Sequence, residues 1–70
     1  MIRKGTKIQW KWGQGTAQGV VKETFTNKVS RTLSGTEVTR EGTSGDKALL
    51  IEQEDGTEVL KLESEVKRRD

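Results

Sequence analysis

Hydrophobic and polar residues alternate strictly in the first segment of the chain that predicts regular structure. Between Thr6 and Trp12 every second residue is apolar, and these positions are Ile8, Trp10 and Trp12. A period of two with aromatic and β-branched residues predicts a half-buried strand. Residues 13–15 (Gly-Gln-Gly) predict a tight turn after it, because glycine reaches positive φ without steric cost.

A second, longer strand is predicted from Thr16 to about Thr26. Its alternation places Val20 on one face and, on the other, Ala17, Gly19, Val21 and Phe25. A glycine inside a strand pattern predicts a bulge or a sharp bend, where another backbone or side chain comes close. We therefore expect this strand to bend near Gly19.

The middle of the chain predicts a hairpin of low apolar content. Val29–Leu33 and 37–40 are rich in Thr and Val, and they flank a turn at residues 34–36. Because few of its residues are apolar, we expect this hairpin to project from the body of the domain. A small, polar loop follows at residues 41–46.

The C-terminal third contains the most apolar run, residues 48–51, which predicts a central strand packed on both faces. An Asp-Gly pair within residues 54–57 predicts a hairpin, and residues 59–62 form its return strand. Residues 63–66 predict a helical turn, because Leu62 and Val66 are four positions apart. Residues 67–70 are expected to be a frayed basic tail.

Five or six short antiparallel strands joined by tight turns predict an all-β fold, and we interpret it as a small SH3-like barrel. A barrel removes the unpaired strand edges that invite aggregation, and it lets few apolar residues fill one interior. We expect a single domain over residues 1–66, followed by the tail at 67–70. At 70 residues the chain has room for one small core,.

Composition limits the chemistry. The chain has no His and no Cys, which excludes thiolate metal sites and thiol catalysis,. Thirteen Lys and Arg against eleven Asp and Glu give a net charge of +2, well short of the dense positive stripe of typical nucleic-acid binders,. No apolar run approaches the roughly 20 residues of a membrane span, and no signal-peptide core follows the N-terminus. We expect a cytoplasmic domain without membrane contact, cofactor or metal.

These elements together resemble the short bacterial and fungal Tudor-like domains named after a hypervirulence-associated protein. The resemblance extends from Lys4 to Val66, and it implies an SH3-like barrel of the Tudor type without implying an enzymatic activity or a particular ligand. Where such domains often carry Tyr just before the apolar run, this chain has Leu49. The residues that carry the resemblance are Lys4, Gly5, Trp10, Gly13, Gly15, Gly19, Val21, Thr32, Gly35, Arg40, residues 50–56 and 59–61, Ser64 and Glu65.

The two tryptophans are predicted to have different roles. Ile8 and Trp10 are among the few apolar residues of the chain that are large enough to fill a core, so Trp10 is expected to be structural. Trp12 adjoins the turn and is expected at the barrel rim, where it either contacts a ligand or covers the core. A methyl-lysine cage needs several converging rings. The chain offers only these two tryptophans and Phe25, so we do not expect such a cage.

Four basic residues are the remaining binding candidates. Arg31 and Arg40 lie on opposite arms of the predicted hairpin, and a two-strand register can bring them to one surface. With Lys11 or Lys61 they form a candidate site for phosphate groups, on which Trp12 would stack a base. The alternative is a solvated exterior whose charge is partly cancelled by neighbouring carboxylates.

Other patterns predict no site. The glycines at 13, 15 and 19 miss the dinucleotide-binding spacing by one residue, and no helix follows them. The acidic group Glu52, Glu54, Asp55 and Glu58 matches no calcium-loop spacing and is interpreted as hairpin surface. A pair such as Glu52 with Glu65 is the best the chain offers for acid–base catalysis, and nothing places it in a cleft.

We therefore expect a non-enzymatic binding module. Our first hypothesis is that it recognises a protein or peptide through the rim around Trp12, Lys11 and the hairpin arginines. The second hypothesis is weak binding of nucleic acid or a nucleotide through the same basic surface. A third is self-association through the edge of the hairpin.

Overall fold

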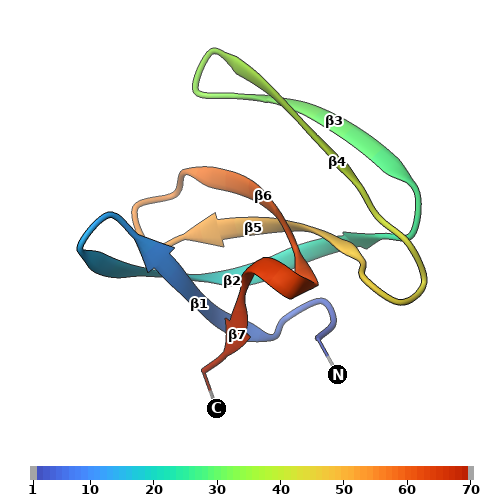
Figure 1. Ribbon diagram of the computed structural model, residues 1–70. Helices are drawn as coiled ribbons and strands as arrows, with labels where there is room; N and C mark the ends of the chain where they lie inside the picture. The colour runs from blue at the N-terminus through green and yellow to red at the C-terminus, as the bar shows by residue number, and fades with distance from the viewer. Residues whose placement is uncertain (1, 70) are drawn as a thin grey trace.

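The computed structural model describes residues 2–69 and has seven strands in two antiparallel sheets (Figure 1). The all-β class is confirmed, and six of the strands lie where the sequence predicts them. No helix among these residues is long and apolar enough to cross a membrane. The elements are β1 (Lys7–Trp12), β2 (Gly15–Phe25), β3 (Lys28–Leu33), β4 (Thr36–Glu41), β5 (Ala48–Gln53), β6 (Glu58–Leu62), the 3-10 turn η1 (Glu63–Glu65) and β7 (Lys67–Arg68).

The larger sheet has the strand order β6-β5-β2-β1-β7, and the β3–β4 hairpin forms the second sheet. Figure 1 shows the larger sheet strongly twisted, with the hairpin above β5 and β6 and with η1 joining β6 to β7 at the front. Tight turns connect neighbouring strands. Ser34 and Gly35, both with positive φ, form the two-residue turn of the β3–β4 hairpin,.

Strand β2 bends where its pairing with β5 shifts register. Val21 pairs with Ile51 and Glu23 with Leu50, so Lys22 is an extra residue in β2,. The close approach predicted at Gly19 is confirmed, because a Cβ atom there would lie 2.6 Å from the Ile51 side chain. The bulge itself comes three residues later than Gly19.

The bulge corrects one prediction about β2. Phe25 was expected on the same face as Val21, but it packs with a different group of side chains. The extra residue, Lys22, reverses the alternation, so Phe25 points to the opposite face of the sheet.

The core has two parts, one on each face of β5. The first core cluster consists of Ile8, Trp10, Val21, Leu49, Ile51 and Val66. The second core cluster consists of Val29, Ala48 and Leu60, with half-buried neighbours that include Phe25, Leu33 and Val38. The prediction that residues 48–51 pack on both faces is therefore confirmed.

The β3–β4 hairpin covers the second core cluster, whereas the sequence predicted that it projects freely. Val29 is buried, and Leu33 and Val38 pack against the cluster. At the base of the hairpin, the Gly42 amide donates to the carbonyl of Asn27 at 3.0 Å. The few apolar residues of the hairpin all serve to hold it on the sheet, and its remaining side chains are polar.

The tail at 67–70 was expected to be frayed, and here the structure differs. Lys67 and Arg68 form β7, which pairs with β1, and the Arg69 amide donates to the Lys7 carbonyl at 3.0 Å. Backbone hydrogen bonds hold this segment although its side chains are polar. Ordered structure thus continues past residue 66, and Asp70 lies outside the described residues.

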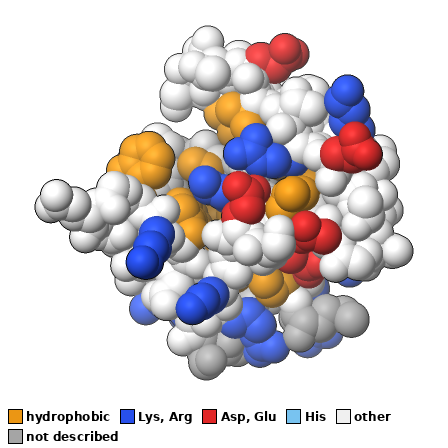
Figure 2. All heavy atoms as spheres, viewed as in Figure 1, with side chains coloured by type: hydrophobic (Ala, Val, Ile, Leu, Met, Phe, Trp, Pro, Cys, Tyr) orange, Lys and Arg blue, Asp and Glu red, His pale blue; other side chains and the backbone are white. Residues whose placement is uncertain are grey.

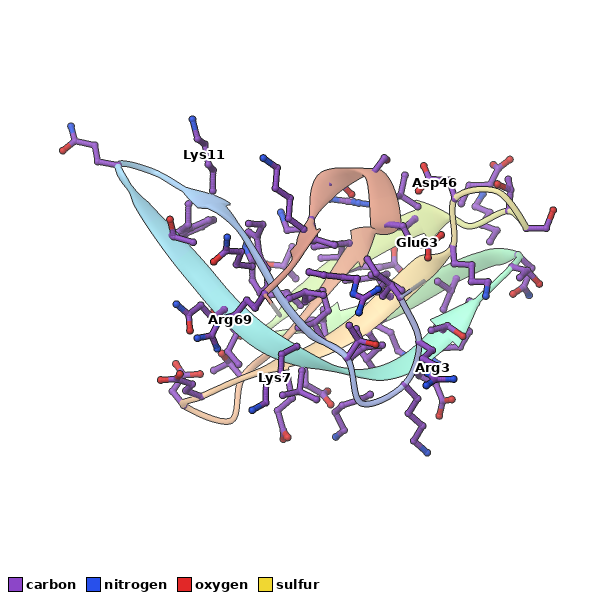
Figure 3. All side chains as sticks on the ribbon, turned by 90° about the horizontal axis from the view of Figure 1, so that it is seen from below. Arg3, Lys7, Lys11, Asp46, Glu63 and Arg69 are labelled. Atoms are coloured by element: carbon purple, nitrogen blue, oxygen red, sulfur yellow. The ribbon has the colours of Figure 1, made fainter. Side chains whose placement is uncertain are left out.

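The predicted helical turn is present as η1, and the loop before β5 holds it in place. Both carboxylate oxygens of Asp46 accept hydrogen bonds from Ser64, from its amide at 2.9 Å and from its hydroxyl at 2.8 Å. The Lys47 amide donates to the Glu63 carboxylate at 2.9 Å. Figure 3 shows Asp46 and Glu63 at the same end of the molecule. These contacts fix η1 and therefore the position of Glu65.

Candidate functional site

A groove of about 300 Å³ lies between the tip of the β3–β4 hairpin and β6. Both tryptophans line it, together with hairpin residues and four consecutive residues of β6, Glu58 to Lys61. Figure 2 shows this face of the molecule, with hydrophobic side chains beneath the hairpin beside Lys and Arg side chains. Its volume is at the lower end of the range for ligand-binding clefts. The lining residues used below are Trp10, Trp12, Leu33, Val38, Arg40 and Lys61.

The two tryptophans occupy the places that the alternation of β1 predicts. Trp10 is 5% exposed and belongs to the first core cluster, whereas Trp12 is 72% exposed. Trp12 pairs with Gly15 beside the turn, at the end of β1. It points to the same side as Trp10 but stands beyond the side chains that would cover it. Most of its indole surface is therefore available to a partner.

Arg40 is held at the far end of the groove by Glu65. Its Nε atom lies 3.1 Å from the Glu65 Oε1 atom, and its Nη1 atom donates to the Thr39 carbonyl at 2.9 Å. The same Glu65 oxygen accepts a 2.8 Å hydrogen bond from the Leu62 amide. Arg40 is thus fixed in orientation, and its charge is already balanced by a carboxylate.

The pKa of Glu65 lies below its ordinary value. Burial is the largest single influence and acts to raise this pKa. The hydrogen bonds from Leu62 and Arg40, with the charges of Arg40 and Lys61, act to lower it and together prevail,. Glu65 is therefore ionised at neutral pH, as its contact with Arg40 requires.

Lys61 and Glu58 differ in how their charges are balanced. Glu58 accepts a hydrogen bond from Lys22 at 3.0 Å, and Glu52 lies 3.9 Å from the same ammonium group. The hydrogen bond to Glu58 and the charges of both carboxylates raise the pKa of Lys22. Among the described residues, Lys61 has no carboxylate within ion-pair distance. Lys61 is therefore a lining cation of the groove whose charge no ion pair among the described residues balances.

Of the five predicted binding residues, the structure brings Trp12, Arg40 and Lys61 to the groove. Lys11 alternates with the tryptophans along β1 and lies on its other face. Figure 3 shows Lys11 extending from β1 into solvent. Arg31 is placed elsewhere, with its guanidinium carbon 5.2 Å from the centre of the Phe25 ring.

The predicted arginine pair is only partly realised. The β3–β4 register puts Arg31 opposite Val38 and Arg40 opposite Val29, so both arginines lie on one face of the hairpin, as expected. Their guanidinium groups nevertheless go to different partners, Phe25 and Glu65. They do not form a joint phosphate site.

Sequence reasoning missed the hairpin contribution to the groove. Leu33 and Val38 line it, although they were assigned only to a polar, projecting hairpin. The register explains their position, because Val38 shares the inner face of the hairpin with the buried Val29. The spacing of Val29, Leu33 and Val38 about the turn was the signal that could have shown an apolar inner face.

The aromatic rings do not converge into a cage. Trp10 is buried and Phe25 lies beneath Arg31, which leaves Trp12 as the exposed ring. Leu49, at the position where the resemblance suggested a Tyr, is fully buried in the first core cluster. The groove therefore presents one aromatic platform.

A second surface of different character lies where β7 pairs with β1. Lys67 is opposite Gln9, and Arg69 bonds to the backbone of Lys7, so the outward side chains of both strands are basic or neutral. Figure 3 shows Lys7 and Arg69 beside each other at the start of β1. The sequence carried a signal for this surface, since its first acidic residue is Glu23.

No group of three or more His, Cys, Asp or Glu side chains within residues 2–69 could hold a metal ion. In the acidic segment, Asp55 accepts hydrogen bonds from the amide and the hydroxyl of Thr57, and these lower its pKa. Asp55 thus closes the β5–β6 turn.

A family model described as the TUDOR domain of hypervirulence-associated proteins matches residues 5–66, nearly the whole chain. No curated protein and no solved structure matches the chain significantly. The matched region contains both core clusters and every residue that lines the groove. The resemblance found in the sequence is confirmed: the chain belongs to the TUDOR domain family of hypervirulence-associated proteins.

Proposed function

We propose that this domain is a non-enzymatic module that binds a peptide segment of a partner protein in the groove beside Trp12. The observation that carries the proposal is the 72% exposure of Trp12 at the mouth of the groove. Tryptophan is enriched among the residues that dominate binding energy at interfaces. An indole left in water beside an apolar groove gains free energy when a partner covers it.

The groove supplies an apolar contact and a polar one. Apolar side chains of the partner pack against Trp12 and against the hairpin residues Leu33 and Val38, which are half-buried without the partner. The charge of Arg40 is already balanced by Glu65, so Lys61 is the lining cation that is available to a carboxylate of the partner. This combination favours a peptide with apolar and acidic residues.

The test is a display selection with random seven-residue peptides, followed by titration of the selected peptide into labelled domain. Amide shifts are expected around Trp12 and β6, and Trp12→Ala is expected to weaken binding by about 2 kcal/mol. Val20→Ala is the matched control, because Val20 is the other exposed large apolar residue among those described, at 40%. Equal losses in the two variants, or no selected peptide, would refute the proposal.

A second candidate function is weak binding of nucleic acid, and the basic surface of β1 and β7 favours it. Lys7, Lys11, Lys67 and Arg69 replace the predicted Arg31 and Arg40 pair as its contacts. Fluorescence polarisation with single- and double-stranded probes at about 50 and about 200 mM salt tests it. Binding must weaken at the higher salt and in Lys7→Glu, since phosphate contacts release counterions.

A further inference from the structure

We propose that the partner peptide binds as an additional β-strand on the outer edge of β6. This inference rests on the proposed function and specifies its mode. The occupant is an extended segment of a partner protein, with apolar side chains at alternate positions and a carboxylate near Lys61.

The β5–β6 ladder determines which backbone groups of β6 point outward. The register runs from Ala48 opposite Leu62 to Glu52 opposite Glu58, and one residue further at each end Lys47 faces Glu63 and Gln53 faces Thr57. Both pairs are joined by backbone hydrogen bonds, from Glu63 N to Lys47 O at 2.9 Å and from Gln53 N to Thr57 O at 2.8 Å. Hydrogen-bonded and non-hydrogen-bonded pairs alternate in an antiparallel ladder.

The same alternation makes Glu58, Leu60 and Leu62 the non-hydrogen-bonded positions of β6. Their N–H and C=O groups therefore point away from β5. Leu62 shows this directly, because its amide donates to Glu65 at 2.8 Å. Glu58 and Leu60 line the groove, and within the described residues β6 is the last strand of its sheet. Such an edge is a template for a further strand.

The hairpin does not supply that strand itself. Leu33 and Thr36 are the pair next to the two-residue turn, so the alternation directs the Thr39 backbone away from β3,. The Thr39 carbonyl accepts a hydrogen bond from its neighbour Arg40 at 2.9 Å. The Arg40 side chain thus donates to one of the backbone acceptors that β4 directs away from β3, and β4 and β6 belong to different sheets.

The two walls of the groove suit the two faces of an added strand. Trp10 belongs to the first core cluster, whereas Leu33 and Val38 pack on the second, on the opposite face of the sheet. Successive side chains of a strand point to opposite faces. One set of peptide side chains therefore meets the tryptophans, and the alternate set meets the hairpin. Main-chain bonds would give affinity and the two walls selectivity, as in other cases of strand addition.

Charge complementarity selects the polar residue of the peptide. Arg40 is paired with Glu65, and Glu58 with Lys22. Lys61 lines the groove without an ion-pair partner among the described residues. A carboxylate on the peptide would complete the charge balance of the groove.

The experiment uses a peptide selected from a random, proline-free seven-residue library and a series of its derivatives, each methylated at one backbone nitrogen. Only alternate peptide amides face β6, so methylation at those positions is expected to weaken binding by about tenfold or more. Methylation at the positions between them is expected to have little effect. In the complex, the Leu60 amide should become protected from hydrogen exchange. A methylation profile without a period of two, or an unprotected Leu60 amide, would overturn the inference.

The controls separate this inference from the proposed function. If Trp12→Ala abolishes binding while the methylation profile is flat, the groove binds peptides in another mode and only the inference fails. Lys61→Glu is expected to weaken the binding of an acidic peptide by about tenfold relative to Lys11→Glu. Lys11→Glu is the matched control, because it changes the net charge by the same amount outside the groove. Equal effects of the two charge reversals would remove the carboxylate from the proposal. Light scattering tests for self-association. If the molar mass of the domain rises with concentration and the peptide prevents this rise, a second copy of the domain is the occupant instead.

Discussion

The two faces of β5 are covered in different ways, although one strand supplies the centre of both. On the first face, six buried side chains from β1, β2, β5 and Val66 form a continuous cluster. On the second face only three are buried, and the hairpin residues around them are half-buried. One face is a finished core, while the cover on the other is incomplete. The groove opens where the hairpin fails to cover the second face.

Under the proposed function, this difference divides stability and binding between the two faces. The first core cluster includes both large side chains of β1 that point inward, and their burial stabilises the fold. The hairpin contributes fewer buried apolar contacts, and segments of this kind open at lower free energy than the global unfolding reaction. Substitutions on the two faces are therefore expected to have effects of different size and kind.

The largest effect is expected for Trp10→Ala. Removing a 5% exposed indole from the first core cluster leaves a cavity, and such changes cost about 3–5 kcal/mol,. Small domains often have little more stability than this, so the variant should be largely unfolded by circular dichroism. Trp10→Phe serves as the conservative control and should remain folded. A fully folded Trp10→Ala domain would contradict our description of this face.

A smaller effect is expected for Leu33→Ala on the second face. Leu33 is only half-buried, so we expect a loss of about 1–2 kcal/mol in urea unfolding,. The same variant should weaken peptide binding, because Leu33 lines the groove. A loss as large as that of Trp10→Ala would show that the two faces do not differ in the way proposed.

A still smaller effect, with a pH dependence, is expected for Glu65→Gln. A carboxyl whose pKa is lowered by folding contributes stability above its unfolded pKa of about 4.3 and loses it as pH falls through the folded value,. At neutral pH the free energy of unfolding of the wild type should therefore exceed that of the variant by less than about 1 kcal/mol, because the ion pair of Glu65 with Arg40 is partly exposed,. In chemical unfolding measured across pH, the difference should shrink below about pH 4.3. A difference that grows toward low pH would have the wrong sign.

The smallest effect on stability is expected for Trp12→Ala. With 72% of Trp12 exposed, little surface is removed from contact, and surface substitutions usually change stability by less than about 0.5 kcal/mol,. Thermal unfolding of this variant should match the wild type, while its peptide binding is weaker by about 2 kcal/mol. A large drop in melting temperature would place Trp12 in the core instead.

Local patterns predicted the parts of the fold that depend on local rules. The alternation in β1 was enough to place Trp10 inside and Trp12 at the opening. The unbroken apolar run at residues 48–51 was enough to predict a strand packed on both faces. Each of these inferences needs only the side-chain period of a strand and the amount of apolar surface in a short segment.

The errors came from contacts that no local pattern contains. The bulge at Lys22 depends on how β2 pairs with β5, and it reversed the predicted face of Phe25. Strand β7 has only two residues and no apolar pattern, and backbone hydrogen bonds pair it with β1. The site was affected in the same way, because the contact between Arg40 and Glu65 joins residues 25 positions apart. Sequence reasoning therefore identified three groove residues without identifying the hairpin wall or the edge of β6.

The pairing of β7 with β1 also determines how the domain can be attached to something else. Arg69 lies against Lys7 at the start of β1, and Trp12 lies at the other end of the same six-residue strand, about 16 Å away,. The chain consequently enters β1 and leaves β7 at the same end of β1, the end distant from Trp12. A tag, a linker or a sensor surface attached beyond β7 would therefore leave the exposed indole of Trp12 directed toward solution.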